Sequence, residues 1–171
     1  MSGYHRIRRQ QWIRQAEGYL ELGMPQHALD TLTRCAANGS LPFHGLYLRG
    51  EALKELGRYS EAITPLKEAS IETPDNIHVW LALGWCYKRV GRIDLAIQSL
   101  EEAMEAQPGE ALLHYNLACY WSLAGNKRHS LTYLSQAIDL DPNYKDLVSE
   151  ESDFDPIRSD PVFQALTSVI V

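Results

Sequence analysis

Apolar residues in the middle of the chain follow a helical rhythm that breaks at a glycine. From residue 77 on, a spacing of about 3.6 residues predicts a helix with one buried face, made of Val79, Trp80, Leu83, Gly84, Cys86 and Tyr87. After Gly91, a second stripe predicts another helix over residues 93–105, which buries Ile93, Ala96, Ile97, Leu100 and Ala103. Pro74 and Pro108 bound the pair, because proline is tolerated at a helix edge but not inside a helix. The pattern therefore predicts a helical hairpin.

The hairpin pattern recurs at a fixed step along the chain. Glycine stands at 34-residue intervals, at Gly23, Gly57, Gly91 and Gly125. Two further columns keep the same step, namely Trp12, Leu46, Trp80 and His114, and Ala28, Ala62, Ala96 and Ser130. Such self-similarity is typical of stacked hairpins, in which each repeat contacts only its neighbours and an extended concave surface stays open. We therefore expect an all-α solenoid that binds a partner rather than catalysing a reaction.

Composition limits the class of protein further. With 171 residues, of which 45% are hydrophobic, the chain is long enough to bury a continuous core. Cys35, Cys86 and Cys119 form neither a paired zinc motif nor an even disulfide framework, which favours a reducing compartment. The first residues lack the apolar run of a signal peptide, and no apolar stretch of about 18 residues occurs. A soluble, cytoplasmic protein without a membrane partner is expected.

Charge is distributed unevenly between the two ends. The net charge of −6 disfavours a nucleic-acid partner, because phosphate binding depends on clustered Lys and Arg. Residues 1–14 nevertheless carry no acid and four arginines, Arg6, Arg8, Arg9 and Arg14. Residues 138–160 hold eight Asp or Glu against Lys145 and Arg158. A solvated basic end and an acidic cap are the simpler interpretation, and head-to-tail association into a homo-oligomer is the alternative.

The repeating columns resemble the tetratricopeptide repeat. The third unit matches the loose pattern of that family throughout, with Trp80, Leu83, Gly84, Tyr87, Gly91, Ala96, Leu100, Ala103 and Pro108. The other units depart from it at Arg49, where leucine is usual, at Ser130, where a small alanine is usual, and at Gln15 and Ser40. The resemblance implies a right-handed α-solenoid of four repeats over residues 9–144, divided as 9–42, 43–76, 77–110 and 111–144. A basic arm, 1–8, would precede the repeats, and a C-terminal capping segment, 145–171, would follow them.

The capping segment is expected to cover the apolar edge of the last repeat. Residues 144–148 predict a short helix, and residues 149–159 are acidic and turn-rich. Asp160 and Pro161 predict the N-cap and first turn of a last helix, whose inward side chains would be Phe163, Leu166 and Ile170. Docking of residues 169–171 into another copy is the alternative to docking on the same chain.

The resemblance also implies where a partner would bind, because the first helix of each repeat lines the groove in this family. The corresponding partner-binding candidates are Arg14, Glu17, His44, Tyr47, Leu48, Glu51, His78, Leu81, Trp85, Lys88, Arg89, Leu112, Tyr115, Asn116 and Cys119. An apolar, aromatic strip would run through the middle of this set, formed by Tyr47, Leu48, Leu81, Trp85, Leu112 and Tyr115. Trp85 is the expected anchor. The alternative is that Trp85 and Tyr115 only pack on the following repeat.

Aromatic anchors beside mixed charges suit a peptide or an amphipathic helix of a partner protein. The sequence therefore predicts a non-enzymatic adaptor or scaffold, and Glu17 and Glu51 disfavour a partner that offers a carboxylate to this groove. A small secretion-type or assembly chaperone and a self-assembling oligomeric scaffold are the alternatives. The histidines are scattered and the glycines are single, so no catalytic residue, metal ligand or cofactor is predicted.

Overall fold

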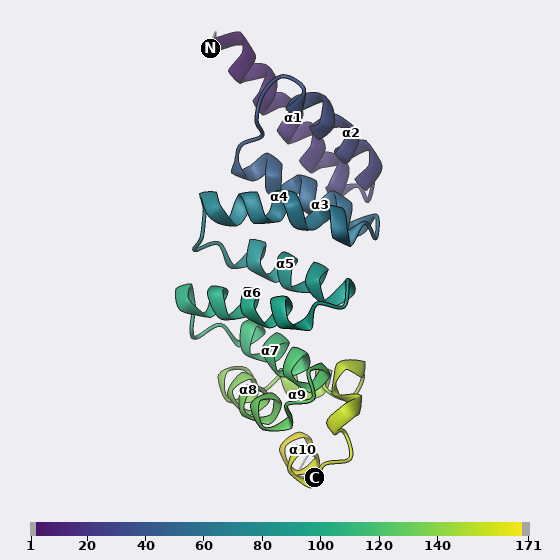
Figure 1. Ribbon diagram of the computed structural model, residues 1–171, viewed down its shortest axis with the longest axis vertical. Helices are drawn as coiled ribbons and strands as arrows, with labels where there is room; N and C mark the ends of the chain where they lie inside the picture. The colour runs from purple at the N-terminus through teal and green to yellow at the C-terminus, as the bar shows by residue number, and fades with distance from the viewer. Residues whose placement is uncertain (1–2, 169–171) are drawn as a thin grey trace. The chain divides into compact units, whose positions relative to one another are not determined.

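The computed structural model describes the backbone of residues 3–168 and the side chains of residues 6–168. The secondary structure of this part of the chain is helical throughout (Figure 1). The chain divides into two compact units, Met1–Val90 and Gly91–Val171, and each is described by itself.

The N-terminal unit contains five helices, α1 (Gly3–Glu21), α2 (Pro25–Ala36), α3 (Phe43–Glu55), α4 (Tyr59–Glu72) and α5 (Ile77–Arg89). Consecutive helices pack on one another as antiparallel hairpins, and α3 also contacts α1 and α5. The first helices of successive repeats are therefore neighbours within this unit. Because α1 begins at Gly3, residues 3–8, expected as a basic arm, continue the first helix of the first repeat.

The glycines of the repeating column close the turns inside the hairpins. Gly57 has a φ of 72°, a left-handed conformation that a β-carbon disfavours. Its N–H donates to the Lys54 carbonyl at 3.0 Å, and the Arg58 N–H donates to the Leu53 carbonyl at 2.8 Å, which satisfies the end of α3. Gly23, Gly91 and Gly125 also have positive φ, at 67°, 79° and 76°. The backbone reason for the recurring glycine is confirmed.

The core of the N-terminal unit follows the small and large positions of the repeat. Ala28 and Ala62 are fully buried, and so are Leu32 and Leu66. Gly50 lies against Leu66, so α3 and α4 approach closely because one side chain is missing. Trp80 is only partly buried, and its indole N–H donates to the Pro74 carbonyl at 2.7 Å. Trp80 therefore packs part of its ring against the core while its indole N–H bonds the preceding loop.

The C-terminal unit contains α6 (Ile93–Ala106), α7 (Ala111–Leu123), α8 (Lys127–Leu140), α9 (Tyr144–Leu147), a 3-10 helix η1 (Ser152–Ile157) and α10 (Pro161–Thr167). Helix α7 packs on α6, α8 and η1, whereas α9 and α10 contact α8. The observed α6 ends one residue beyond the predicted limit at Glu105. Ser130 replaces the usual alanine at no polar cost, because its hydroxyl donates to the Ala118 carbonyl at 2.7 Å.

The C-terminal segment packs on the preceding hairpin, with η1 on α7 and with α9 and α10 on α8. Phe163 is buried and Leu166 is half-buried, whereas Ile170 and the rest of residues 169–171 lie outside the described part of the chain. The acidic stretch expected to be turn-rich contains η1, which buries Phe154 completely. Within residues 3–168, no helix is both long and apolar enough to cross a membrane.

Candidate functional site

The candidate residues fall into two groups, one in each unit. Those of the N-terminal unit come from α1, α3 and α5, the first helices of its repeats. We call their shared surface the α1/α3/α5 face and define it by Glu17, His44, Tyr47, Glu51, Lys54, Leu81 and Trp85. Arg14 and His78 are exposed on α1 and α5.

A polar contact between side chains joins the first two helices of this face. Glu17 on α1 and His44 on α3 approach to 3.2 Å between a carboxylate oxygen and Nε2. Both side chains are nearly half exposed, at 45% and 46%, so solvent screens the pair. The pair positions two polar groups at the margin of the face and contributes little to stability.

The middle of the face combines a phenol with a carboxylate. Tyr47 stacks on Phe43 one turn earlier, with ring centroids 6.4 Å apart. Burial raises the pKa of Tyr47 to about 12, and the negative charge of Glu51 adds to this effect. Glu51 Oε2 accepts from Lys54 Nζ at 2.7 Å, whereas Glu51 Oε1 is shielded from water and has no hydrogen-bond partner. Glu51 Oε1 is therefore a buried hydrogen-bond acceptor without a donor.

Trp85 supplies the largest apolar surface of the face. Its side chain on α5 is 43% exposed, and the ammonium of Lys88 lies 5.3 Å from the centre of the indole ring. Leu81, one turn earlier, is half-buried. The alternative, in which Trp85 packs on the following repeat, concerns α7 of the other unit and stays a prediction. An exposed indole beside a cation can accept an apolar or aromatic side chain.

Two candidates of the N-terminal unit differ from the expectation that they line an open groove. Leu48 is buried in the hydrophobic core, because its position on α3 faces the packed side of the helix. The guanidinium of Arg89 lies 5.0 Å above the ring of Tyr59 on α4. Arg89 thus makes a cation–π contact with α4 of its own chain, so its guanidinium is not directed only at a partner.

The candidates of the C-terminal unit are partly covered by the chain's own tail. Tyr115 is buried, with its ring 4.9 Å from that of Tyr144 and edge-on to Phe154 at 5.8 Å. Burial raises the pKa of Tyr115, and the charges of nearby acidic groups add to the rise. Cys119 is buried as well, and η1 packs on α7. The structure therefore corrects the expectation of an open groove at Tyr115 and Cys119, whereas Leu112 stays exposed and Asn116 half-buried.

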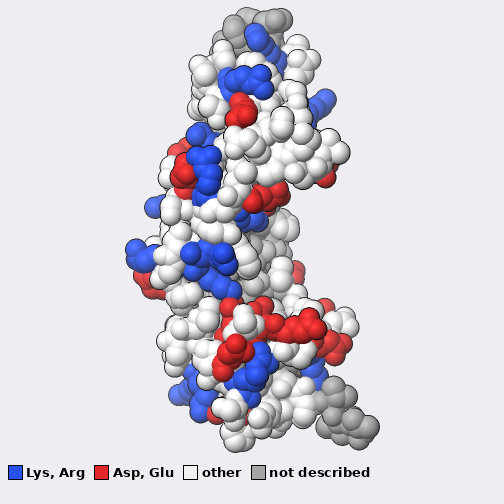
Figure 2. Space-filling view, turned by 90° about the vertical axis from the view of Figure 1, so that its right-hand side faces the viewer, with Lys and Arg blue, Asp and Glu red and all other residues white. Residues whose placement is uncertain are grey.

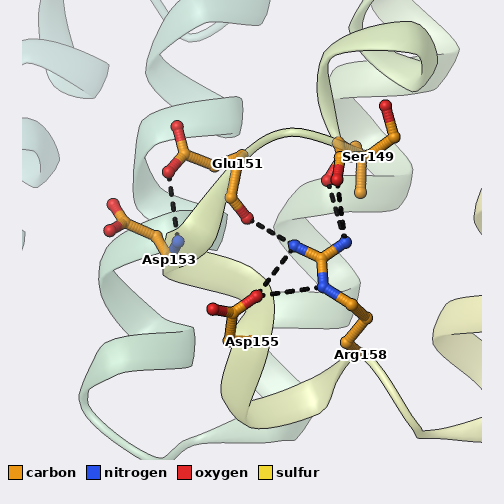
Figure 3. A network of polar contacts seen from close by, with 6 residues as sticks. Ser149, Glu151, Asp153, Asp155 and Arg158 are labelled. Carbon is orange, nitrogen blue, oxygen red and sulfur yellow. Dashed lines mark hydrogen bonds and ion pairs between the residues drawn. The ribbon is translucent and has the colours of Figure 1, made fainter.

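Arg158 holds the covering segment in shape. Figure 3 shows its guanidinium enclosed by the loop that leads into η1. It donates to the backbone carbonyls of Val148, Ser149 and Glu151 at 3.3, 3.3 and 2.8 Å, and it pairs with Asp155 at 3.0 Å. One arginine thus satisfies three carbonyl groups of an irregular segment. On the face that Figure 2 shows, acidic side chains gather over this part of the C-terminal unit.

One group of side chains in the C-terminal unit has the donor types that bind metal ions. The sulfur of Cys119 and carboxylate oxygens of Glu151 and Asp153 lie within 4.8 Å of one another. Glu151 Oε1 already accepts the backbone N–H of Asp153 at 3.1 Å (Figure 3). The sequence holds no signal for this group, because Cys119 comes from α7, Glu151 precedes η1 and Asp153 lies within η1, and the three follow no ligand spacing.

The stacked helical hairpins place the chain in the class of helical-repeat proteins. Trp85, on the first helix of one repeat, presents an aromatic side chain to solvent. Two family models described as tetratricopeptide repeat match residues 13–77 and 53–118. The chain belongs to the tetratricopeptide repeat family. No curated protein sequence matches it.

Solved structures agree with the fold. A crystal structure of MamA is similar with a TM-score of 0.75 and 18% identity, covering 81% of each chain. MamA from Desulfovibrio magneticus is similar with a TM-score of 0.72 and 22% identity, covering 86% of this chain and 87% of that one. YrrB, described as a TPR protein with an unusual peptide-binding site, has a TM-score of 0.74 and 22% identity, covering 79% of this chain and 70% of its own. The all-α tetratricopeptide solenoid is confirmed, and the fold supports a general role as a protein–protein interaction adaptor.

Proposed function

We propose that the chain binds a segment of a partner polypeptide on the α1/α3/α5 face, with Trp85 as the anchor. The exposure of Trp85 carries this proposal, because a large indole left 43% exposed keeps apolar surface in contact with water. Tryptophan is among the residues that contribute most to binding when a partner buries them. The likeness to YrrB, which is described as binding a peptide, supports the same kind of ligand.

The acids on α1 and α3 of the α1/α3/α5 face indicate what the segment would carry beside the residue that contacts Trp85. Glu51 Oε1 lacks a donor, and Glu17 is half exposed beside the imidazole of His44. A partner that offers a lysine, an arginine or a backbone N–H would complete a charge-assisted hydrogen bond at Glu51 once the side chain turns toward it. A partner carboxylate would be repelled by both acids. We therefore expect an apolar or aromatic side chain near a basic one.

The proposal is tested by selecting displayed random peptides on the full chain and measuring the affinity of the selected peptides by calorimetry. Trp85→Ala should weaken binding by about 2 kcal/mol or more, because anchor truncations cost that much. Its thermal midpoint should stay near that of the wild type. Ile71→Ala is the matched control, since Ile71 is exposed on α4, away from the α1/α3/α5 face.

Two results would contradict the proposal. The selected peptides could bind Trp85→Ala as tightly as the wild type, which would show that another surface holds them. Trp85→Ala could instead unfold the N-terminal unit, which would show that the indole contributes to packing rather than to recognition. Binding should also weaken in Glu51→Gln when the peptide carries a basic residue, since the neutral amide makes a weaker hydrogen bond to a cation.

A further inference from the structure

Arg49 stands where the repeat usually has a leucine. Its side chain lines a pocket on the side of α3 that faces away from the α1/α3/α5 face. Glu51 and Arg49 are two positions apart, about 200° around the helix axis, because each residue turns an α-helix by about 100°. We call this pocket the outer pocket; it has a volume of about 460 Å³. Its lining combines Leu46, Arg49 and Leu53 of α3 with Asp30 of α2 and Glu61 and Glu68 of α4. All of these residues belong to the N-terminal unit.

Two of the acids that line the outer pocket with Arg49 are already engaged by other groups. Both carboxylate oxygens of Glu61 accept from Arg58, at 2.8 and 2.6 Å. The charge of Arg49 helps to lower the pKa of Glu61, although the hydrogen bond from Arg58 is the main cause. Asp30 accepts from the side-chain amide of Gln26 at 2.8 Å. Glu61 and Asp30 are thus hydrogen-bonded to Arg58 and Gln26 rather than to Arg49.

The guanidinium of Arg49 has one N–H group that donates no hydrogen bond. Its Nε atom is shielded from water and has no hydrogen-bond partner. An unmatched donor of this kind costs stability, whereas the leucine usual at this position has no polar group to satisfy. A rotation of the guanidinium would turn the Nε–H toward the pocket, where an incoming carboxylate could take one bond from Nε and one from an Nη atom. Side-on pairing of this kind suits the planar fork of arginine.

We propose that the outer pocket binds an acidic side chain of a partner polypeptide, held by Arg49, in a segment that also carries a lysine or an arginine. The second charge follows from the rest of the lining. Glu68 is exposed on α4 and makes no ion pair within residues 6–168. Asp30, Glu61 and Glu68 outnumber Arg49 and Arg58, so a segment with only negative charge would be repelled. A segment of mixed charge complements both signs. This site is separate from the α1/α3/α5 face and does not depend on it.

The probe is a synthetic helix-forming peptide, acetylated and amidated, with one glutamate and one lysine a helical turn apart. The readout is the arginine Nε–H region of a nitrogen-15 correlation spectrum of the full chain, with the Arg49 signal assigned by its loss in Arg49→Leu. Binding should shift this signal, and replacing the peptide glutamate by glutamine should weaken binding about tenfold or more. An Arg49 signal that does not move while the peptide is titrated to millimolar concentrations overturns the proposal.

Arg49→Leu separates recognition from folding, because it restores the residue usual in the family. We expect it to keep or raise the thermal midpoint and to remove peptide binding. Arg128→Leu is the matched control, since Arg128 is exposed on α8 in the other unit, and it should bind as the wild type does. Glu68→Gln should remove the preference for lysine in the peptide while leaving the requirement for glutamate. Equal binding by Arg49→Leu and the wild type, or loss of fold in Arg49→Leu, contradicts the proposal.

Discussion

Asp160 shows how one side chain can serve a helix end and a tertiary contact together. Its Oδ1 accepts the backbone N–H groups of Val162 and Phe163, at 2.8 and 3.3 Å, and so caps α10. Its Oδ2 accepts from Lys127 Nζ at 2.7 Å, which links α10 to the start of α8. The hydrogen bond from Lys127 is the main cause that lowers the pKa of Asp160, and the two backbone N–H groups contribute. The N-cap was predictable from Asp160 and Pro161, whereas the partner Lys127 was not.

The docking of α10 should therefore depend on pH. Because the carboxyl pKa is lower in the folded protein than its ordinary value of 3.8, the stabilisation is present above that value and is lost as pH falls through the folded pKa. Asp160→Asn should loosen α10 at neutral pH and make little difference in strong acid. Hydrogen exchange of the α10 amides measures this. A difference between Asp160→Asn and the wild type that is constant over the whole acid range would contradict the assignment.

At the scale of elements, the hairpin α3/α4 depends on the absence of one β-carbon. A β-carbon added at Gly50 would overlap the side chain of Leu66, which is fully buried and cannot move without disturbing the core. Gly18, in the interior of α1, has no atom within 4 Å of the corresponding position. The two glycines are both helical, but packing constrains only Gly50.

Gly50→Ala should lower the free energy of unfolding by about 1–3 kcal/mol, because it overpacks the contact between α3 and α4. Gly18→Ala is the matched control and should raise it by about 0.5–1 kcal/mol, since alanine loses less conformational entropy in a helix. Urea denaturation of both variants measures the difference. If both substitutions were stabilising, the close approach at Leu66 would not be a constraint in solution.

At the scale of the whole molecule, every cysteine is buried and none is part of a disulfide. Cys35 and Cys86 lie in the N-terminal unit, and Cys119 lies under the tail of the C-terminal unit. Burial raises the pKa of Cys86 to about 11 and also raises that of Cys35. Because the thiolate is the reactive form, folding should suppress the reaction of these thiols.

The native protein should react slowly with iodoacetamide, and unfolding should make all three cysteines reactive. Labelling at increasing urea, followed by mass spectrometry of each cysteine peptide, gives separate transitions for the two units. Cys119 should label together with the release of the tail from α7. Fast labelling of Cys119 in native buffer, with Cys35 and Cys86 protected, would show that the tail does not cover α7 in solution.

The repeat pattern predicted much of the fold, for reasons that particular residues make plain. Gly57 needs a left-handed backbone, and the stripe of Ile97 and Leu100 has helical spacing, so both signals are local. The candidate site was harder to predict. Trp85 is exposed, whereas Leu48 faces the core and Tyr115 lies under Phe154. Phe154 stands in an acidic stretch without periodicity, so nothing in the sequence placed it on α7.

The class of fold was readable from the residues alone, because helical spacing, turn glycines and bounding prolines act within one repeat and recur in the next. Which first-helix positions face solvent emerged only from the packing of the folded chain, since burial depends on segments distant along the chain. The tertiary structure also showed that Glu51 and Arg49 each keep a bond unmade on different sides of α3. Unmet hydrogen bonds are properties of surroundings rather than of residue type. The proposal for the outer pocket follows from that of Arg49, whereas the proposal for the α1/α3/α5 face rests on the exposure of Trp85.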